Sequence, residues 1–97
     1  MIDAKALFEK FEDEFLKFDR VQNPECGSPD ICAFLRIDRM LPTSDGSDMV
    51  TCAEHDQIWL RPDIESFNGV ATEDDVLFLA RCGVFFDNDV DSLSMFV

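Results

Sequence analysis

Four cysteines and one histidine are the residues of this chain best suited to bind a metal or act in nucleophilic chemistry. Five residues separate Cys26 from Cys32, and two residues separate Cys52 from His55. Thiolates and an imidazole are common ligands of structural zinc, so these four side chains form a conceivable zinc set. The longer gap and the position of Cys32 inside an expected strand instead favour ordinary buried or surface thiols. Reduced thiols are also expected from a cytosolic chain.

His55 could also serve as a general base for a nucleophilic thiol. Its candidate partners are Cys52 and Cys26, and either Asp56 or Glu54 could orient the imidazole. The favoured interpretation is that His55 is a polar residue in a solvated turn. The sequence has no glycine-rich phosphate loop, so we expect a protein that is not an enzyme.

The segment Asp87-Asn88-Asp89-Val90-Asp91 begins like a calcium-binding loop. Such a loop needs glycine at its sixth position and a glutamate at its twelfth. The sixth position here is Ser92, and the twelfth falls beyond Val97. An EF-hand is therefore excluded, and we expect no cofactor.

The composition of the chain describes a small, strongly acidic domain. Its 97 residues carry 21 acidic and 8 basic side chains, for a net charge of −13, and 46% of them are hydrophobic. This length predicts a single domain over residues 1–97, with enough apolar surface for its own core. No stretch approaches the ~20 apolar residues of a membrane span, and acids occupy the start where a signal peptide has basic residues. We therefore expect a cytoplasmic protein that binds neither membranes nor nucleic acid directly, because its charge repels phosphates.

The first half of the sequence predicts one helix followed by strands. Asp3 is a suitable N-cap for a helix of about sixteen residues that ends before residues 21–24. Its apolar stripe consists of Ala4, Leu7, Phe8, Phe11, Phe15 and Phe18. Residues 31–38 alternate as a strand, and residues 49–52 return after an Asp-Gly turn, which predicts a hairpin over residues 31–53. A third strand over residues 57–61, stopped by Pro62, completes a three-stranded meander.

The second half predicts a second helix and two further strands. Residues 63–69 fit one helical turn closed by Gly69. Thr72 is a typical N-cap for a short helix, and Gly83 suits the position just after its end. Residues 84–86 predict a buried strand, and the alternation of Leu93, Met95 and Val97 predicts a last one. The fold class is thus α+β, with an antiparallel sheet of about three to five strands.

The acidic residues occur in tight groups on expected turns, helix starts and polar faces. Besides residues 12–14, the groups that we expect to bind a partner are Glu54, Asp56, Asp63, Glu65, Glu73, Asp74, Asp75, Asp87, Asp89 and Asp91. A domain of this size is about 33 Å across, and that length of duplex DNA holds about 19 phosphates. The 21 carboxylates therefore give a comparable density of negative charge.

In size, charge and lack of catalytic motifs, the chain resembles the small acidic phage-encoded inhibitors that mimic DNA, such as anti-CRISPR and anti-restriction proteins. The resemblance covers the whole chain and involves no shared motif, so it assigns no residue roles. It implies a contact surface made of acidic groups. Lys5, Lys10 and Lys17 depart from this pattern, because they dilute the negative charge of the first helix.

The favoured expectation is a non-enzymatic inhibitor that competes with DNA for a positively charged groove of a nucleic-acid-processing complex. The alternatives are an acidic adaptor with an apolar partner contact, a small Cys/His zinc domain and a merely solubilising charge. A homo-oligomer that uses exposed aromatic residues such as Trp59, Phe67 or Phe96 is compatible with these functions.

Overall fold

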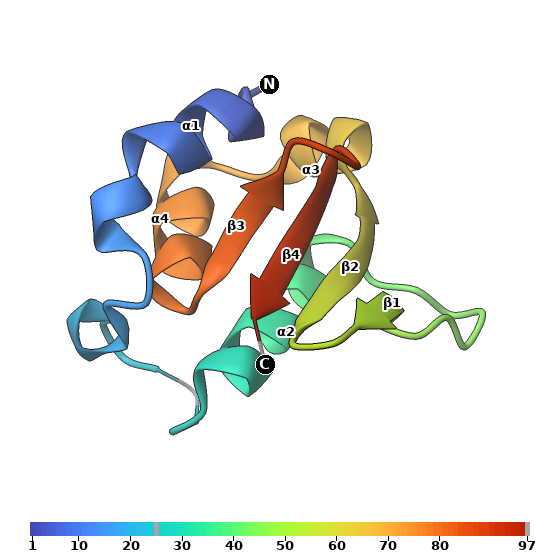
Figure 1. The fold of residues 1–97 in the computed structure, drawn as a ribbon, viewed down its shortest axis with the longest axis horizontal. Coiled ribbons are helices and arrows are strands. Elements are labelled where there is room, and N and C mark those ends of the chain that lie inside the picture. Colours follow the sequence, from blue (N-terminus) through green and yellow to red (C-terminus); the bar gives the residue numbers. More distant parts are fainter. Residues whose placement is uncertain (25, 97) are drawn as a thin grey trace.

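The computed structural model describes residues 1–24 and 26–96, which form an α+β domain. In chain order the elements are α1 (Ala4–Lys10), α2 (Pro29–Met40), β1 (Val50–Glu54), β2 (Gln57–Asp63), α3 (Ile64–Val70), α4 (Glu73–Arg81), β3 (Val84–Asp87) and β4 (Ser92–Phe96). The strands form one antiparallel sheet in the order β1-β2-β4-β3. The fold class and the N-terminal helix predicted from the sequence are confirmed. In Figure 1, α2 lies behind the sheet, and α1 and α4 lie on the side of the sheet where β3 forms the edge.

The first helix begins as predicted but ends much earlier. The Asp3 carboxylate accepts a hydrogen bond from the N–H of Ala6, yet α1 stops at Lys10. The chain then continues through 3₁₀ turns at Glu12–Glu14 and Phe18–Arg20. Leu16 lies between these turns with φ 61°, and its N–H donates to the carbonyl of Ala80 on α4. The prediction of a helix of about sixteen residues was wrong because contacts with α4 and β3 bend the chain.

Residues 31–38 form helix, and the predicted strand there was wrong. Pro29 occupies the first turn of α2, where its missing N–H costs little. Ala33 and Ile37 lie four residues apart and are both fully buried. Ile31 and Leu35 gave the segment its alternating pattern, but they are 47% and 38% exposed. Because this strand is absent, the predicted hairpin over residues 31–53 and the predicted three-stranded meander are also wrong.

The next two strands confirm the prediction of an antiparallel pair. β1 pairs with β2, and β2 also pairs with β4 rather than ending at Pro62. The register between β2 and β4 shifts between Trp59 and Asp63. Proline lacks an N–H and is tolerated in sheets at such irregularities. Pro62 therefore lies buried inside the strand that it was expected to stop.

The C-terminal half largely follows the sequence prediction. Asp63 caps α3, although this helix continues past Gly69 to Val70. Thr72 and Asp75 form a capping box at the start of α4, and Gly83 follows its C-cap with φ +98°. This positive φ favours glycine, and a Cβ atom at Gly83 would stand 2.6 Å from Cδ2 of Leu16, so the Leu16 side chain would also have to shift. Leu93 and Met95 of β4 are buried as expected, and Val97 lies outside the described residues.

The core lies between the helices and one face of the sheet. Its largest fully buried side chains are Phe67, Ile37, Leu60, Leu79 and Leu93. Phe67 is 0% exposed, so the suggestion that it is an exposed aromatic residue was wrong. Cys82, the residue that ends α4, is also buried. Among the described residues, no helix has both the length and the apolar character needed to cross a membrane.

Candidate functional site: the acidic end of the sheet

Five of the predicted carboxylates lie at one end of the sheet, and we call them the turn-end cluster. They are Asp63, Glu65, Asp87, Asp89 and Asp91. Ser92 of β4 is the cross-strand partner of both Asp63 and Asp87. Because neighbouring strands are about 4.8 Å apart, the backbones of Asp63 and Asp87 lie about 10 Å apart. Asp89 and Asp91 belong to the turn between β3 and β4, and Glu65 lies in the first turn of α3.

Hydrogen bonds keep two members of the turn-end cluster ionised. Asp87 accepts from Nε1 of Trp59 at 3.0 Å, from the N–H of Asp89 at 2.9 Å and from Nε2 of Gln57 at 3.1 Å. These bonds, that of Trp59 first, lower the pKa of Asp87. The backbone N–H and hydroxyl of Ser66 likewise lower the pKa of Asp63. Both carboxyl groups therefore carry their charge at neutral pH.

Five of the basic side chains form ion pairs with acids outside the turn-end cluster. The ion pairs between described residues are Lys10–Glu73, Arg20–Glu14, Arg36–Asp75, Arg61–Asp38 and Arg81–Glu14. Burial opposes the ionisation of Glu14, but hydrogen bonds from Arg20 and Arg81 outweigh it and lower the pKa of this carboxyl. In these pairs no lysine or arginine neutralises a member of the turn-end cluster. Four of its members are exposed, and Asp87 is half-buried, with its carboxylate bonded by Trp59 and Gln57.

The predicted acidic group at the start of α4 is used by the fold itself. Asp75 completes the capping box and binds Nε of Arg36 at 2.9 Å, with its side chain 14% exposed. Glu73 binds Nζ of Lys10 at 2.8 Å. Asp74 is the remaining exposed acid of this group. Residues Glu73–Asp75 therefore offer a partner less charge than their sequence suggests.

Glu54 and Asp56 lie at the opposite end of β2 from the turn-end cluster. Glu54 pairs with Gln57, the first residue of β2, whereas Asp63 is the last. The seven residues of β2 separate the two ends by about 20 Å. The structure thus divides the predicted partner-binding acids into three separate groups.

The candidate zinc ligands are also divided. Cys52 and His55 are exposed in the β1–β2 hairpin, whereas Cys26 and Cys32 lie at the start of α2. Among the described residues, no group of three or more His, Cys, Asp or Glu side chains is arranged to hold a metal ion. His55 lies in the turn between the strands with φ 54°, which agrees with the prediction of a polar turn residue.

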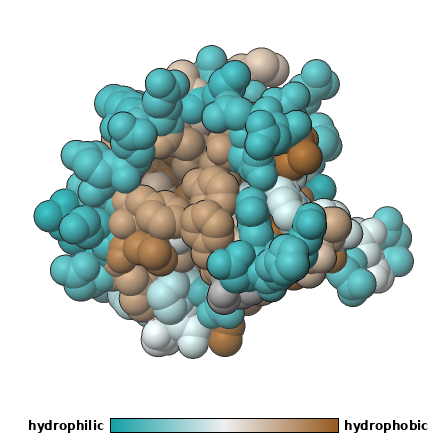
Figure 2. Space-filling model, in the orientation of Figure 1, coloured by the Kyte–Doolittle hydropathy of each residue, from teal (hydrophilic) through white to brown (hydrophobic). Residues whose placement is uncertain are grey.

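Sequence reasoning missed an aromatic groove on the sheet face turned away from the core. Phe85 stacks on Phe96 with ring centroids 4.8 Å apart, and Phe15 meets Phe85 edge-on at 6.0 Å. Phe8 and Phe11 of the α1 side complete the walls of this groove, whose volume is about 320 Å³. Figure 2 shows a hydrophobic patch on this face of the molecule, surrounded by hydrophilic residues. From the sequence, Phe96 was expected to be exposed, but Phe8, Phe11 and Phe15 were assigned to the apolar stripe of a single helix, so nothing joined these rings in one groove.

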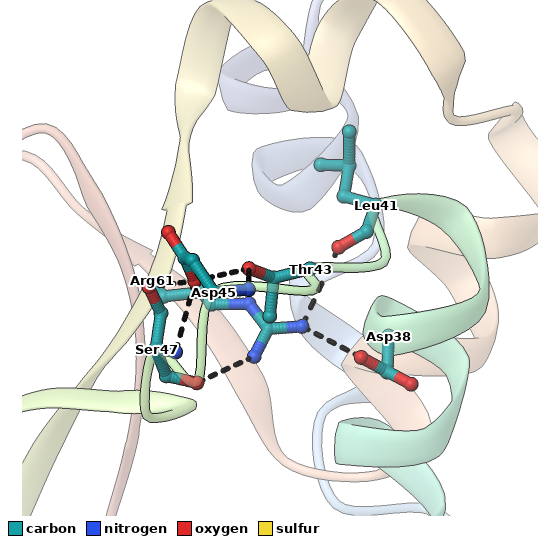
Figure 3. A network of polar contacts seen from close by, with 6 residues as sticks. All are labelled: Asp38, Leu41, Thr43, Asp45, Ser47 and Arg61. Carbon is teal, nitrogen blue, oxygen red and sulfur yellow. Dashed lines mark hydrogen bonds and ion pairs between the residues drawn. The ribbon is translucent and has the colours of Figure 1, made fainter.

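A network of polar contacts fixes the loop that joins α2 to β1. Arg61 of β2 donates to Oδ1 of Asp38 at 2.7 Å and to the carbonyl oxygens of Leu41 and Ser47. Figure 3 shows its guanidinium between α2 and the loop. Within the loop, Asp45 accepts from the hydroxyls of Thr43 and Ser47 and from the N–H of Ser47. Hydrogen bonds therefore hold the loop from Leu41, where it leaves α2, to Ser47.

We expect this loop to loosen in acid. Hydrogen bonds from Ser47 and Thr43 lower the pKa of Asp45 from 3.8 to about 2. Because the folded-state pKa is the lower one, the carboxylate stabilises the loop fully above pH 3.8 and loses this effect as the pH falls through about 2. The NMR shift of the Ser47 amide should titrate with that midpoint, and Asp45→Asn should abolish the titration. A midpoint near 3.8 would contradict these bonds.

Comparison of the chain with protein-family models, with curated proteins and with solved structures gives no match.

Proposed function

We propose that this chain is a non-enzymatic inhibitor that mimics DNA. It competes for the positively charged DNA-binding groove of a nucleic-acid-processing complex of the CRISPR-Cas or restriction type. The proposal puts its action in the cytoplasm, that of the host cell if a phage encodes it. The observation that carries the proposal is the turn-end cluster, in which five carboxylates share one end of the sheet. None of the ion pairs described above joins a lysine or arginine to a member of this cluster.

The spacing of the turn-end cluster supports this proposal. Asp63 and Asp87 mark a width of about 10 Å, and duplex DNA places about six phosphates in that length. Five carboxylates over this distance present a similar charge density. A groove lined by lysine and arginine would exchange its counterions for them as it does for phosphates.

The dimensions of the whole molecule support the same function. The principal extents are 33 × 28 × 27 Å, and a duplex of the longest of these lengths carries about 19 phosphates. Glu54 and Asp56 add negative charge about 20 Å from the turn-end cluster, at the other end of β2. The net charge of −13 draws the protein toward a cationic groove before contact forms.

The experiment that tests this function is competition for DNA binding. Purified chain is titrated into pre-formed mixtures of labelled duplex DNA with CRISPR effector complexes and restriction enzymes, at low and high salt. We expect displacement of DNA from at least one class, with an apparent affinity that falls steeply as salt rises. A complete lack of displacement across these classes at low salt would refute the proposal.

The aromatic groove favours a second candidate function, an adaptor that binds a protein partner through an apolar contact. Its occupant would be an aliphatic or aromatic side chain from a segment flanked by lysine or arginine. Glu12 lines the groove, and a net charge of −13 opposes a second copy of this chain as the occupant. Binding of this kind would depend less on salt than competition with DNA does, and it would be lost in Phe96→Ser, because Phe96 is 56% exposed.

A further inference from the structure

Cys26 and Cys32 form the closest pair of reactive side chains in the described part of the chain. Their Sγ atoms are 3.0 Å apart. The Cys32 thiol also donates to the carbonyl oxygen of Cys26 at 3.2 Å, and the Cys26 thiol donates to that of Ser28 at 3.6 Å. Both sulfurs are therefore held in place by the backbone that joins them.

The local sequence explains why the two thiols meet. Ser28 is the N-cap of α2 and Pro29 begins the helix, so the chain turns sharply between the two cysteines. Cys32 faces the core from the first turn of α2 and is 2% exposed. Cys26 precedes the turn and is half-buried. One thiol of the pair is thus open to a small molecule in solution, and the other lies directly behind it.

The distance between the sulfurs favours a disulfide over a metal site. Two thiolates on a tetrahedral zinc ion, each about 2.3 Å from the metal, stand about 3.8 Å apart. The observed separation is shorter, and the described residues supply no third ligand to this pair. Approach of two thiols along a short turn is the arrangement from which a disulfide closes with little backbone movement.

We propose that Cys26 and Cys32 form a redox modification site that takes up an intramolecular disulfide by exchange with a low-molecular-weight disulfide of the glutathione type. The Cys26 thiolate attacks one sulfur of that disulfide, forms a mixed disulfide and releases one thiolate. Cys32 then loses its proton to solvent and attacks Sγ of Cys26, which expels the second thiolate. The two cysteines give up two electrons, and the small disulfide is reduced to two thiols that take up the two protons.

The surroundings of the four thiols assign these roles. Burial and the hydrogen bond with Cys26 raise the pKa of the Cys32 thiol, so the more accessible Cys26 reacts first. Burial raises the pKa of Cys82 to about 12, which keeps that neighbour protonated and unreactive. Cys52 is exposed on β1 and has no cysteine beside it among the described residues, so it is limited to a mixed disulfide.

The test is oxidation of the folded, purified chain with oxidised glutathione, followed by intact mass and peptide mapping. We expect the loss of two hydrogen masses at the pair, a Cys26–Cys32 cross-linked peptide, and a rise of about 5–15 °C in Tm that dithiothreitol reverses. Cys52→Ser should leave this reaction unchanged. Cys32→Ser should stop at a glutathione adduct on Cys26.

A second variant controls for a folding defect in Cys32→Ser, since Cys32 is buried. Cys26→Ser alters only the half-buried thiol and should abolish the cross-link, with Cys32 unmodified in the folded chain. Glutathione adducts without a cross-link in the unaltered chain, or a cross-link mapped to another pair, would overturn the proposal. This result is independent of whether the chain displaces DNA.

Discussion

Exchanging Glu65, Asp89 and Asp91 together for their amides is expected to weaken competition with DNA by about 10²-fold at 0.1 M salt. Each charge that replaces a phosphate contributes a slope of about 0.9 in log affinity against log salt, so three charges should lower that slope by about 2.7. The fold should tolerate the change, because the side chains of these three residues are exposed and Asp91 has a φ of 51° that asparagine accepts. The measurement is DNA displacement over a range of salt concentrations.

A matched variant separates the turn-end cluster from total charge. Glu9→Gln, Asp13→Asn and Asp19→Asn remove the same three charges from exposed positions on α1 and the turns that follow it. We expect a much smaller loss, because separated surface charges are screened within about 10 Å at 0.1 M salt. Equal losses in the two variants would show that net charge alone drives binding. An unchanged affinity of the first variant would remove the turn-end cluster from the mechanism.

The residues Glu73–Asp75 do not make a useful third variant of this kind. The Asp75 carboxylate accepts from the N–H of Thr72 and pairs with Arg36, so Asp75→Asn would weaken the start of α4. Loss of a helix cap usually costs about 1 kcal/mol. A decrease in affinity after this change would mix a folding effect with a charge effect.

Truncating Phe67 to alanine is expected to lower the free energy of unfolding by about 3–5 kcal/mol. The ring is fully buried and packs 6.4 Å from the ring of Phe8, so α3 and α1 both lose contact when it is removed. A domain of this size has about 5–15 kcal/mol of stability in total, so the variant would unfold readily. Urea titration followed by circular dichroism measures the change.

Phe96→Ala is the matched control for this truncation. It removes a ring of the same size that is 56% exposed, so we expect a loss of less than about 1.5 kcal/mol, most of it from the stack on Phe85. A Phe67→Ala variant no less stable than Phe96→Ala would contradict the burial of Phe67. It would also revive the idea that this ring is available to a partner.

Local signals in the sequence predicted the starts of α1 and α4 and the last two strands. Asp3 and Thr72 cap helices because a short polar side chain needs only the next turn to find its partners. Gly83 was found for the same reason, since the left-handed residue after a helix favours glycine. These features depend on a few neighbouring residues, so the sequence alone determines them.

Features that depend on distant residues were not predictable. The run of Ile31, Ala33, Leu35 and Ile37 fits a strand as well as a helix, and only burial of Ala33 and Ile37 against the core decides between them. The end of α1 depends on Phe85 and Ala80, which contact the chain just after the helix from 70 and 64 residues further along the sequence. Neither contact can be predicted from the hydrophobic pattern of the neighbouring residues.

The candidate site likewise combines features that the local sequence determines with features that depend on distant residues. Each acidic group could be found by inspection, but its neighbours in space could not. Asp63 and Asp87 come together because β4 inserts between β2 and β3. The predicted meander joined neighbouring strands in chain order and therefore gave no reason to group these two residues.

The two edges of the sheet differ in how open they are to pairing with a strand of another molecule, which is the first step of fibre growth. The border at β3 lies beside α1, which blocks the approach of another strand there (Figure 1). The border at β1 has no neighbouring strand in the described sheet, but its ladder is irregular between Val50 and Cys52 and ends at Glu54. Irregular, charged edges resist the edge-to-edge stacking from which amyloid forms. The free edge at β1 is therefore poorly suited to ordered aggregation.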